Sequence, residues 1–274
     1  MFYLQKFYLQ KSLIQTFRTI KEKKWLFLSL LMVEVLFLIL FFAFTLNYQI
    51  NIFQDLEKVM NPLAEIEAPT AGATYEQFPL ESFLEMQASV NSLMKHVGQF
   101  FLLIALIYFL LEGIIWSVLS LIREKKIIPK DLLKNWLKFF FFTLLFLVLF
   151  ALLSAIFLFL LKDSLSPEKF TFFGQIELIF FFVCAYFLAL GYGLLHYTPK
   201  KIFKNLWSSG LKRIYLVLPV ILIKVLLLSL VAIGFYFSTA YSSFLGLIFS
   251  VLGLVLVVLF SKIFWINSLE EIKS

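Results

Sequence analysis

The sequence is poor in charged residues, cysteine and histidine. Charged residues make up 15% of the 274 positions, and the chain has one cysteine and two histidines. Soluble domains carry about 25% charged residues, so a water-soluble single domain and a disordered chain are excluded. A lone cysteine also excludes a disulfide scaffold. What the chain has instead is 62% hydrophobic residues, which indicates a polytopic α-helical membrane protein.

Common enzyme motifs are missing as well. No HExxH, G-x-S-x-G, P-loop or Rossmann glycine pattern occurs. His96 and His196 fall at opposite membrane faces, so with one distant cysteine, Cys184, they cannot build a zinc site. The net charge of +7 is not carried by a soluble basic domain, so a nucleic-acid partner is not expected. We therefore predict a non-enzymatic protein with no cofactor and no metal.

Six apolar runs are long enough to cross a bilayer as helices, which needs about 20 residues. The first is too long for a cleavable signal peptide and indicates a retained span. We expect an all-α bundle in one transmembrane domain, 1–274, with an outer loop at 47–96. The predicted spans are 25–46, 97–122, 139–161, 175–196, 214–237 and 242–261.

The orientation follows from the lysines and arginines between the spans. Nineteen of the 24 lie in segments 1–24, 123–138, 197–213 and 262–274, and four lie in the other three connections. Basic residues favour the cytoplasmic side, so both termini are expected in the cytoplasm of a cell-membrane protein. The outer loop is acidic; a solvated loop is the simplest interpretation, and a cap over the bundle or a site for a cation or a partner are the alternatives.

A short basic segment with a proline is repeated at an offset of 70 residues. Each copy puts apolar residues on one helical face and lysines on the other, as in a helix lying at the membrane interface. A looser copy spans 11–17, so we predict three units, each an interfacial elbow followed by a hairpin of spans. Basic linkers that arise independently from the charge rule are the alternative. The elbows would contact anionic lipids through Lys130, Lys134, Trp136, Lys200, Lys204 and Trp207.

Three ionisable residues fall deep inside predicted spans: Glu34, Glu112 and Lys224. Each lies about 15 Å from the cytoplasmic end of its span at 1.5 Å per residue, so the three could meet. Intramembrane charges are rare and point to a site. A structural ion pair, a proton or cation site, and no contact at all are the three interpretations. Pro219, one turn before Lys224, is expected to kink its helix and free a carbonyl group.

Gly191, Tyr192 and Gly193 resemble a potassium-channel filter, which needs a non-helical loop between two spans. The triplet lies inside one predicted span, and Ala185, Ala189 and Gly193 form a stripe of small residues. Such stripes let helices approach closely, so we favour a packing role.

The elbows at 129–137 and 199–207, with their following hairpins, resemble the six-span membrane domain fused to some glycerophosphodiester phosphodiesterases and related prokaryotic membrane proteins. The phosphodiesterase domain is absent, so the resemblance implies an architecture and no activity. We expect a membrane scaffold or accessory subunit, with a protein partner or a second copy of the chain. The rival interpretation is a small transporter or ion-coupled permease that uses the midplane charges; a lipid-modifying enzyme is a third.

Overall fold

A computed structural model describes residues 2–67, 80–122, 124, 127–161, 167–240 and 244–273. Within these ranges every regular element is a helix, and six helices are long and apolar enough to cross a membrane. The chain is therefore an all-α integral membrane protein. It divides into two compact units: one of residues 1–34 and 112–274, and one of residues 35–111.

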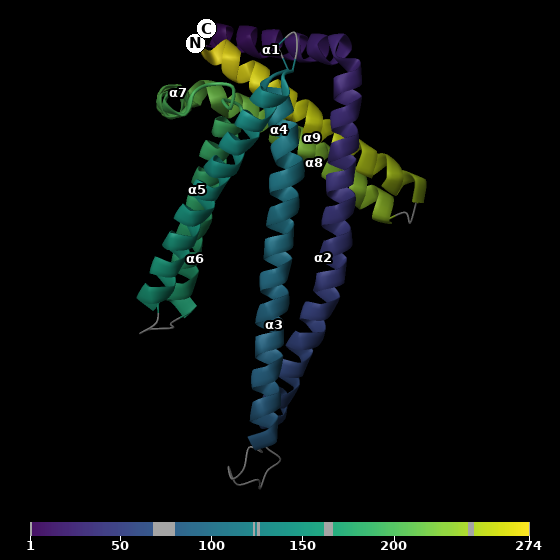
Figure 1. Cartoon of the computed structure of the whole chain (residues 1–274), viewed down its shortest axis with the longest axis vertical. Helices are drawn as coiled ribbons and strands as arrows, with labels where there is room; N and C mark the ends of the chain where they lie inside the picture. The colour runs from purple at the N-terminus through teal and green to yellow at the C-terminus, as the bar shows by residue number, and fades with distance from the viewer. Residues whose placement is uncertain are drawn as a thin grey trace. The chain divides into compact units, whose positions relative to one another are not determined.

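The smaller unit consists of two long helices. It contains most of α2 (Lys24–Glu67), all of α3 (Leu80–Ile107) and the first residues of the π-helix η1 (Tyr108–Glu112). Aromatic side chains link the two long helices: the rings of Tyr48 and Phe100 lie 5.9 Å apart, and those of Phe37 and Tyr108 lie 6.5 Å apart. The ribbons of α2 and α3 run alongside each other (Figure 1), and these ring contacts join them.

The outer connection is more helical than the loop expected at 47–96. Helix α2 runs through Pro62 to Glu67, and α3 begins at Leu80; residues 68–79 lie outside the described part of the chain. The 44 residues of α2 measure about 66 Å at 1.5 Å per residue, about twice the thickness of a bilayer core. Loss of hydropathy marks where a helix leaves the lipid and does not mark where the helix ends, so the expected bounds of the spans stay predictions.

The larger unit contains two helical hairpins and several shorter helices. Helices α5 and α6 form one hairpin, and α8 and α9 form the other (Figure 1). Its complete elements are α1 (Phe2–Glu22), α4 (Gly113–Ser120), α5 (Pro129–Leu161), α6 (Pro167–Tyr192), α7 (Pro199–Asn205), the π-helix η2 (Leu206–Leu211), α8 (Ile214–Ala240) and α9 (Phe244–Lys273).

Helix α9 forms the centre of this unit. Its C-terminal half is buried from Ser261 to Leu269, and it packs against α1, α4 and α8. The indole of Trp265 is 1% exposed, and its Nε1 donates a hydrogen bond of 2.8 Å to the carbonyl oxygen of Ala189 in α6. The core of the unit therefore gathers around the last turns of the chain.

A polar seam joins α1 to α9. Lys11 Nζ lies 2.7 Å from a carboxylate oxygen of Glu271, and Asn267 donates a 3.0 Å hydrogen bond to the hydroxyl of Thr16. The apolar residues Ile14 and Phe17 of α1 are about 60% exposed. Small polar residues of α1 are therefore buried against α9, while these two large apolar residues are exposed.

The buried hydroxyl of Tyr8 anchors the first turns of α1. It donates a hydrogen bond to the carbonyl oxygen of Leu216 in α8. Burial raises the pKa of Tyr8 to about 12, so the hydroxyl keeps its proton at every physiological pH. The start of the chain is thereby fixed to the second hairpin.

The two elbows expected at 129–137 and 199–207 differ from each other in structure. Pro129 and Pro199 are the first residues of α5 and α7, as their prolines allow. Residues 129–137, however, are the first turns of the long helix α5 and no separate helix, because nothing between them and the span interrupts the helical hydrogen bonds. Residues 199–205 form a short helix of their own. Lys130, Lys134, Lys200 and Lys204 are exposed, as is Trp207, whereas Trp136 is half-buried.

The glycine triplet lies in the packed end of α6 and the turn after it. A Cβ atom at Gly191 would lie 2.0 Å from the ring of Phe142, and one at Gly193 would lie 2.4 Å from Leu269. The hydroxyl of Tyr192 is 2.7 Å from that of Thr143. All three residues are buried against neighbouring helices, which supports the packing interpretation.

We therefore expect Gly191→Ala to lower the free energy of unfolding by about 1–3 kcal/mol, because Phe142 must move to admit the methyl group. Gly174→Ala in the same helix is the matched control, since a Cβ at that position meets nothing within 4 Å. Thermal unfolding in detergent compares the two variants. Equal stabilities would contradict the close packing of Gly191.

Candidate functional site

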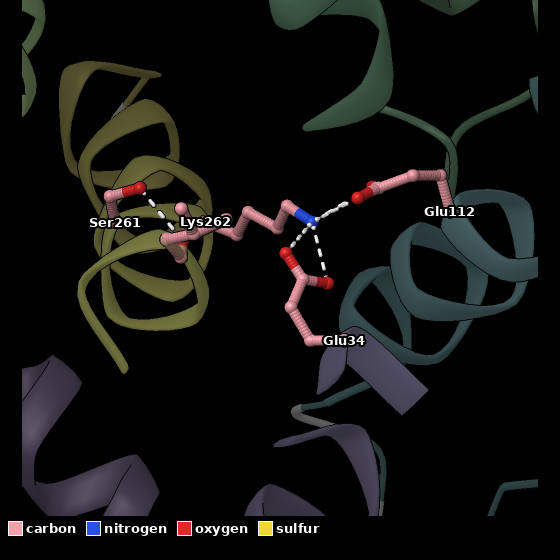
Figure 2. A network of polar contacts seen from close by, with 5 residues as sticks. Glu34, Glu112, Ser261 and Lys262 are labelled. Carbon is pink, nitrogen blue, oxygen red and sulfur yellow. Dashed lines mark hydrogen bonds and ion pairs between the residues drawn. The ribbon is translucent and has the colours of Figure 1, made fainter. Parts of the chain in front are cut away.

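Three charged side chains meet inside the larger unit (Figure 2). The ammonium group of Lys262 lies 2.8 and 3.0 Å from the two carboxylate oxygens of Glu34. It lies 2.7 and 2.8 Å from the two carboxylate oxygens of Glu112. We call Glu34, Glu112 and Lys262 the charge cluster.

Three separate helices supply the cluster. Glu34 lies in the third turn of α2, Glu112 is the last residue of η1, and Lys262 lies in the second half of α9. Figure 2 shows the lysine reaching from α9 toward both carboxylates. A π-helical turn displaces the residues that follow it, and such turns are frequent at functional sites. The turn at 108–112 therefore sets the direction in which Glu112 points.

The charge cluster is buried. Glu34 is 3% exposed, Glu112 is 6% exposed and Lys262 is 7% exposed. The indole of Trp116 closes one side, with its ring centre 5.9 Å from the ammonium nitrogen. Buried charges persist only when they are paired, because an isolated ion loses its hydration. Each of these charges has such a partner.

The charge cluster has more negative than positive charges, and more acceptor oxygens than protons to donate. Two carboxylates and one ammonium sum to −1 when all three are ionised. An ammonium group has three protons to donate, whereas the two carboxylates offer four oxygen atoms to receive them. The cluster can therefore accept one further proton or a monovalent cation and become neutral.

Lys224 is not part of the cluster, which corrects the expected grouping of Glu34, Glu112 and Lys224. Its ammonium nitrogen lies 4.8 Å from the ring centre of Trp265, in a cation–π contact. Lys262 lies between the two carboxylates, where Lys224 was expected. The two glutamates meet as their similar depths allowed, but through a lysine on a different helix.

Sequence reasoning missed Lys262 because the last span was ended at Ser261. The lysine was therefore counted as a cytoplasmic positive charge. Helix α9 in fact continues to Lys273, and Ile263, Phe264, Trp265 and Ile266 are buried. The signal was present: four large apolar residues directly follow the lysine, which is unusual for the start of a solvated tail.

Pro219 lies inside α8, which runs without interruption from Ile214 to Ala240. The expected kink and its freed carbonyl group therefore stay predictions. Pro219 precedes Lys224 by five residues, so any kink concerns the helix that carries the cation–π contact and not a member of the charge cluster.

A second polar group lies in the smaller unit. Asp55, 6% exposed, accepts a hydrogen bond of 3.0 Å from the hydroxyl of Ser92, and its other contact is His96 Nδ1 at 2.6 Å. These residues come from α2 and α3 and join the two helices. In the described part of the chain no three His, Cys, Asp or Glu residues are grouped as metal ligands.

Comparisons with family models, with curated proteins and with solved structures found no match.

We expect Lys262→Met to lower the free energy of unfolding by about 3–5 kcal/mol, because it leaves two buried carboxylates without a cation. Lys224→Met is the matched control and removes one cation–π contact, worth about 1–2 kcal/mol at most. Thermal unfolding in detergent measures both changes.

The triple variant Glu34→Gln, Glu112→Gln, Lys262→Met removes every charge of the cluster and should recover most of the lost stability. A larger loss in Lys224→Met than in Lys262→Met would show that the lysines are assigned wrongly.

Proposed function

We propose that the protein is a non-enzymatic membrane scaffold or accessory subunit in which the charge cluster fixes how the helices are arranged. The observation that carries this proposal is the mutual pairing of Glu34, Glu112 and Lys262, with all four carboxylate oxygens within 3.0 Å of one ammonium nitrogen. A cluster whose members satisfy one another suits a structural junction better than a site that awaits a substrate.

The proposed placement has both termini on the cytoplasmic side of the cell membrane. The strong excess of lysine in the connections on that side supports it. The contact of Lys11 with Glu271 also supports it, because this contact brings the first helix against the last turns of the chain. An even number of spans also places both termini on one side of the membrane.

The proposed partners are anionic membrane lipids and either a protein or a second copy of the chain. Helix α7 places the exposed lysines 200 and 204 beside Phe203, which is 54% exposed, and is followed by Trp207, which is 62% exposed. Apolar rings beside lysines suit the boundary between headgroups and acyl chains. The three-unit repeat belongs to the same proposal, with α1, the start of α5, and α7 as its elbows.

An ion-coupled permease is the second candidate, and one specific observation favours it. The charge cluster carries −1 when fully ionised, and Glu112 ends a π-helical turn. A buried group that can take up a proton or cation next to an irregular helix has the composition of a coupling site. The two candidates differ in whether Glu34 acts by holding the helices or by binding the ion.

The double variant Glu34→Gln, Glu112→Gln separates the two candidates. It leaves the ammonium of Lys262 buried without an anion, so the scaffold proposal predicts a loss of about 3–5 kcal/mol in the free energy of unfolding. The single variant Glu177→Gln is the control, because this carboxylate lies in α6, outside the charge cluster, where it accepts a hydrogen bond from Ser154. Proton flux out of acid-loaded liposomes is measured alongside stability, and wild type should match protein-free liposomes.

The opposite pattern supports the permease: wild type conducts protons, Glu34→Gln abolishes the flux, and the double variant unfolds like wild type. Unchanged stability together with no flux in wild type would show that both roles of the charge cluster are wrong.

A further inference from the structure

An apolar groove lies between α5 and α7 in the larger unit. Its volume is about 580 Å³. We call it the α5–α7 groove. Helix α5 lines it with Lys134, Leu137, Lys138, Phe141 and Leu145, and helix α7 lines it with Ile202 and Phe203.

The α5 residues of the groove form one straight stripe. Positions 134, 137, 141 and 145 are three or four residues apart, so they lie on one face of the helix. From Lys134 to Leu145 the stripe measures about 16 Å at 1.5 Å per residue. The hydrocarbon core of a bilayer is about 30 Å thick, so the stripe spans about one leaflet. The groove therefore has the length of one acyl chain anchored at the membrane surface.

One side of the groove faces outward. Phe141 is 64% exposed, Phe203 is 54% exposed and Leu145 is 42% exposed. Exposed apolar side chains in a spanning helix face lipid, because contact between a large apolar surface and water is unfavourable. The other side is closed by Ile202, which is 3% exposed.

Lys134 and Lys138 line the surface end of the groove, and Lys138 is already hydrogen-bonded to backbone carbonyl groups. Lys138 Nζ lies 2.6 Å from the carbonyl oxygen of Leu195 and 2.9 Å from that of Tyr197, where it closes the end of the turn after α6. Lys134 is exposed, one turn nearer the start of α5. An anion at the surface end of the groove would therefore meet the ammonium of Lys134.

We propose that the α5–α7 groove binds one anionic phospholipid of the cytoplasmic leaflet. The phosphate group pairs with Lys134, and one acyl chain lies along Leu137, Phe141 and Leu145 against Phe203. A cationic group at one end of an apolar groove one leaflet long matches the charge and the length of this ligand. The proposal deepens the proposed contact with anionic lipid and depends on α5 starting at the cytoplasmic side.

The test uses the full chain in detergent, titrated with phosphatidylglycerol or phosphatidylcholine that carry identical acyl chains. Native mass spectrometry reports the number of bound lipids. A basic residue near an anionic lipid contributes about 1 kcal/mol, so wild type should bind phosphatidylglycerol about five-fold more tightly than phosphatidylcholine through Lys134. Lys134→Gln should abolish that preference. Lys58→Gln, which removes an exposed lysine of α2 outside the proposed elbows, should preserve it.

Leu137→Trp fills the groove and tests the acyl chain separately. It should weaken binding of both lipids at the first site by a similar factor, because it removes space rather than charge. Thermal unfolding of each variant verifies the fold, and a second filling variant, Leu145→Trp, replaces Leu137→Trp if the latter fails to fold.

Equal affinity of wild type for both lipids, or unchanged binding in Lys134→Gln and Leu137→Trp, would overturn the proposal. Dimers in place of lipid-bound monomers would overturn it too, because a second copy of the chain would then occupy the groove. These results are separate from the scaffold proposal, since the charge cluster lies on α2, η1 and α9 and its stability test uses none of these variants.

Discussion

A single ammonium group shared by two carboxylates is the interaction on which the larger unit depends. Lys262 is buried with Glu34 and Glu112, and in an apolar surrounding none of the three can remain ionised alone. Each member therefore restricts where the others can go. The start of α2, the end of η1 and the second half of α9 must stay together for the charges to stay paired. Ion triads of this kind are weak sources of net stability, but breaking one by removing a single partner is severe.

The rest of the unit is arranged around the helix that carries the lysine. Helix α9 receives α1 along a polar seam, is hydrogen-bonded to α6 through Trp265, and forms a hairpin with α8. Large apolar side chains on the other faces point outward, as Phe17 and Trp207 do. In water such a surface would aggregate, whereas in a bilayer it is solvated. Buried charges are therefore paired inside the unit while large apolar side chains cover much of its outside, which is the distribution that a membrane solvent favours.

The sequence predicted the class of fold and two of the three cluster residues. Length and hydropathy are sufficient to locate spans, and depth along a helix was sufficient to bring Glu34 and Glu112 together. Lys262 was missed because a lysine near a span end is normally a cytoplasmic anchor, and the counting rule does not test whether the residues beyond it are buried. The end of α2 at Glu67 could not be predicted from hydropathy, because hydropathy reports the solvent of a segment and says little about its backbone. The three-unit repeat and the phosphodiesterase-associated resemblance stay predictions, since no match to a known protein tests them.

A double-mutant cycle between Glu34 and Lys262 measures whether these two side chains form the proposed ion pair. Unfolding free energies of wild type, Glu34→Gln, Lys262→Met and the combined variant give the coupling between the two side chains. Residues in direct contact couple by about 0.5–3 kcal/mol. This ion pair predicts a coupling above about 1 kcal/mol for Glu34 with Lys262, and one near zero for Glu34 with Lys224 in the parallel cycle. The reverse result, coupling to Lys224 and none to Lys262, would contradict it.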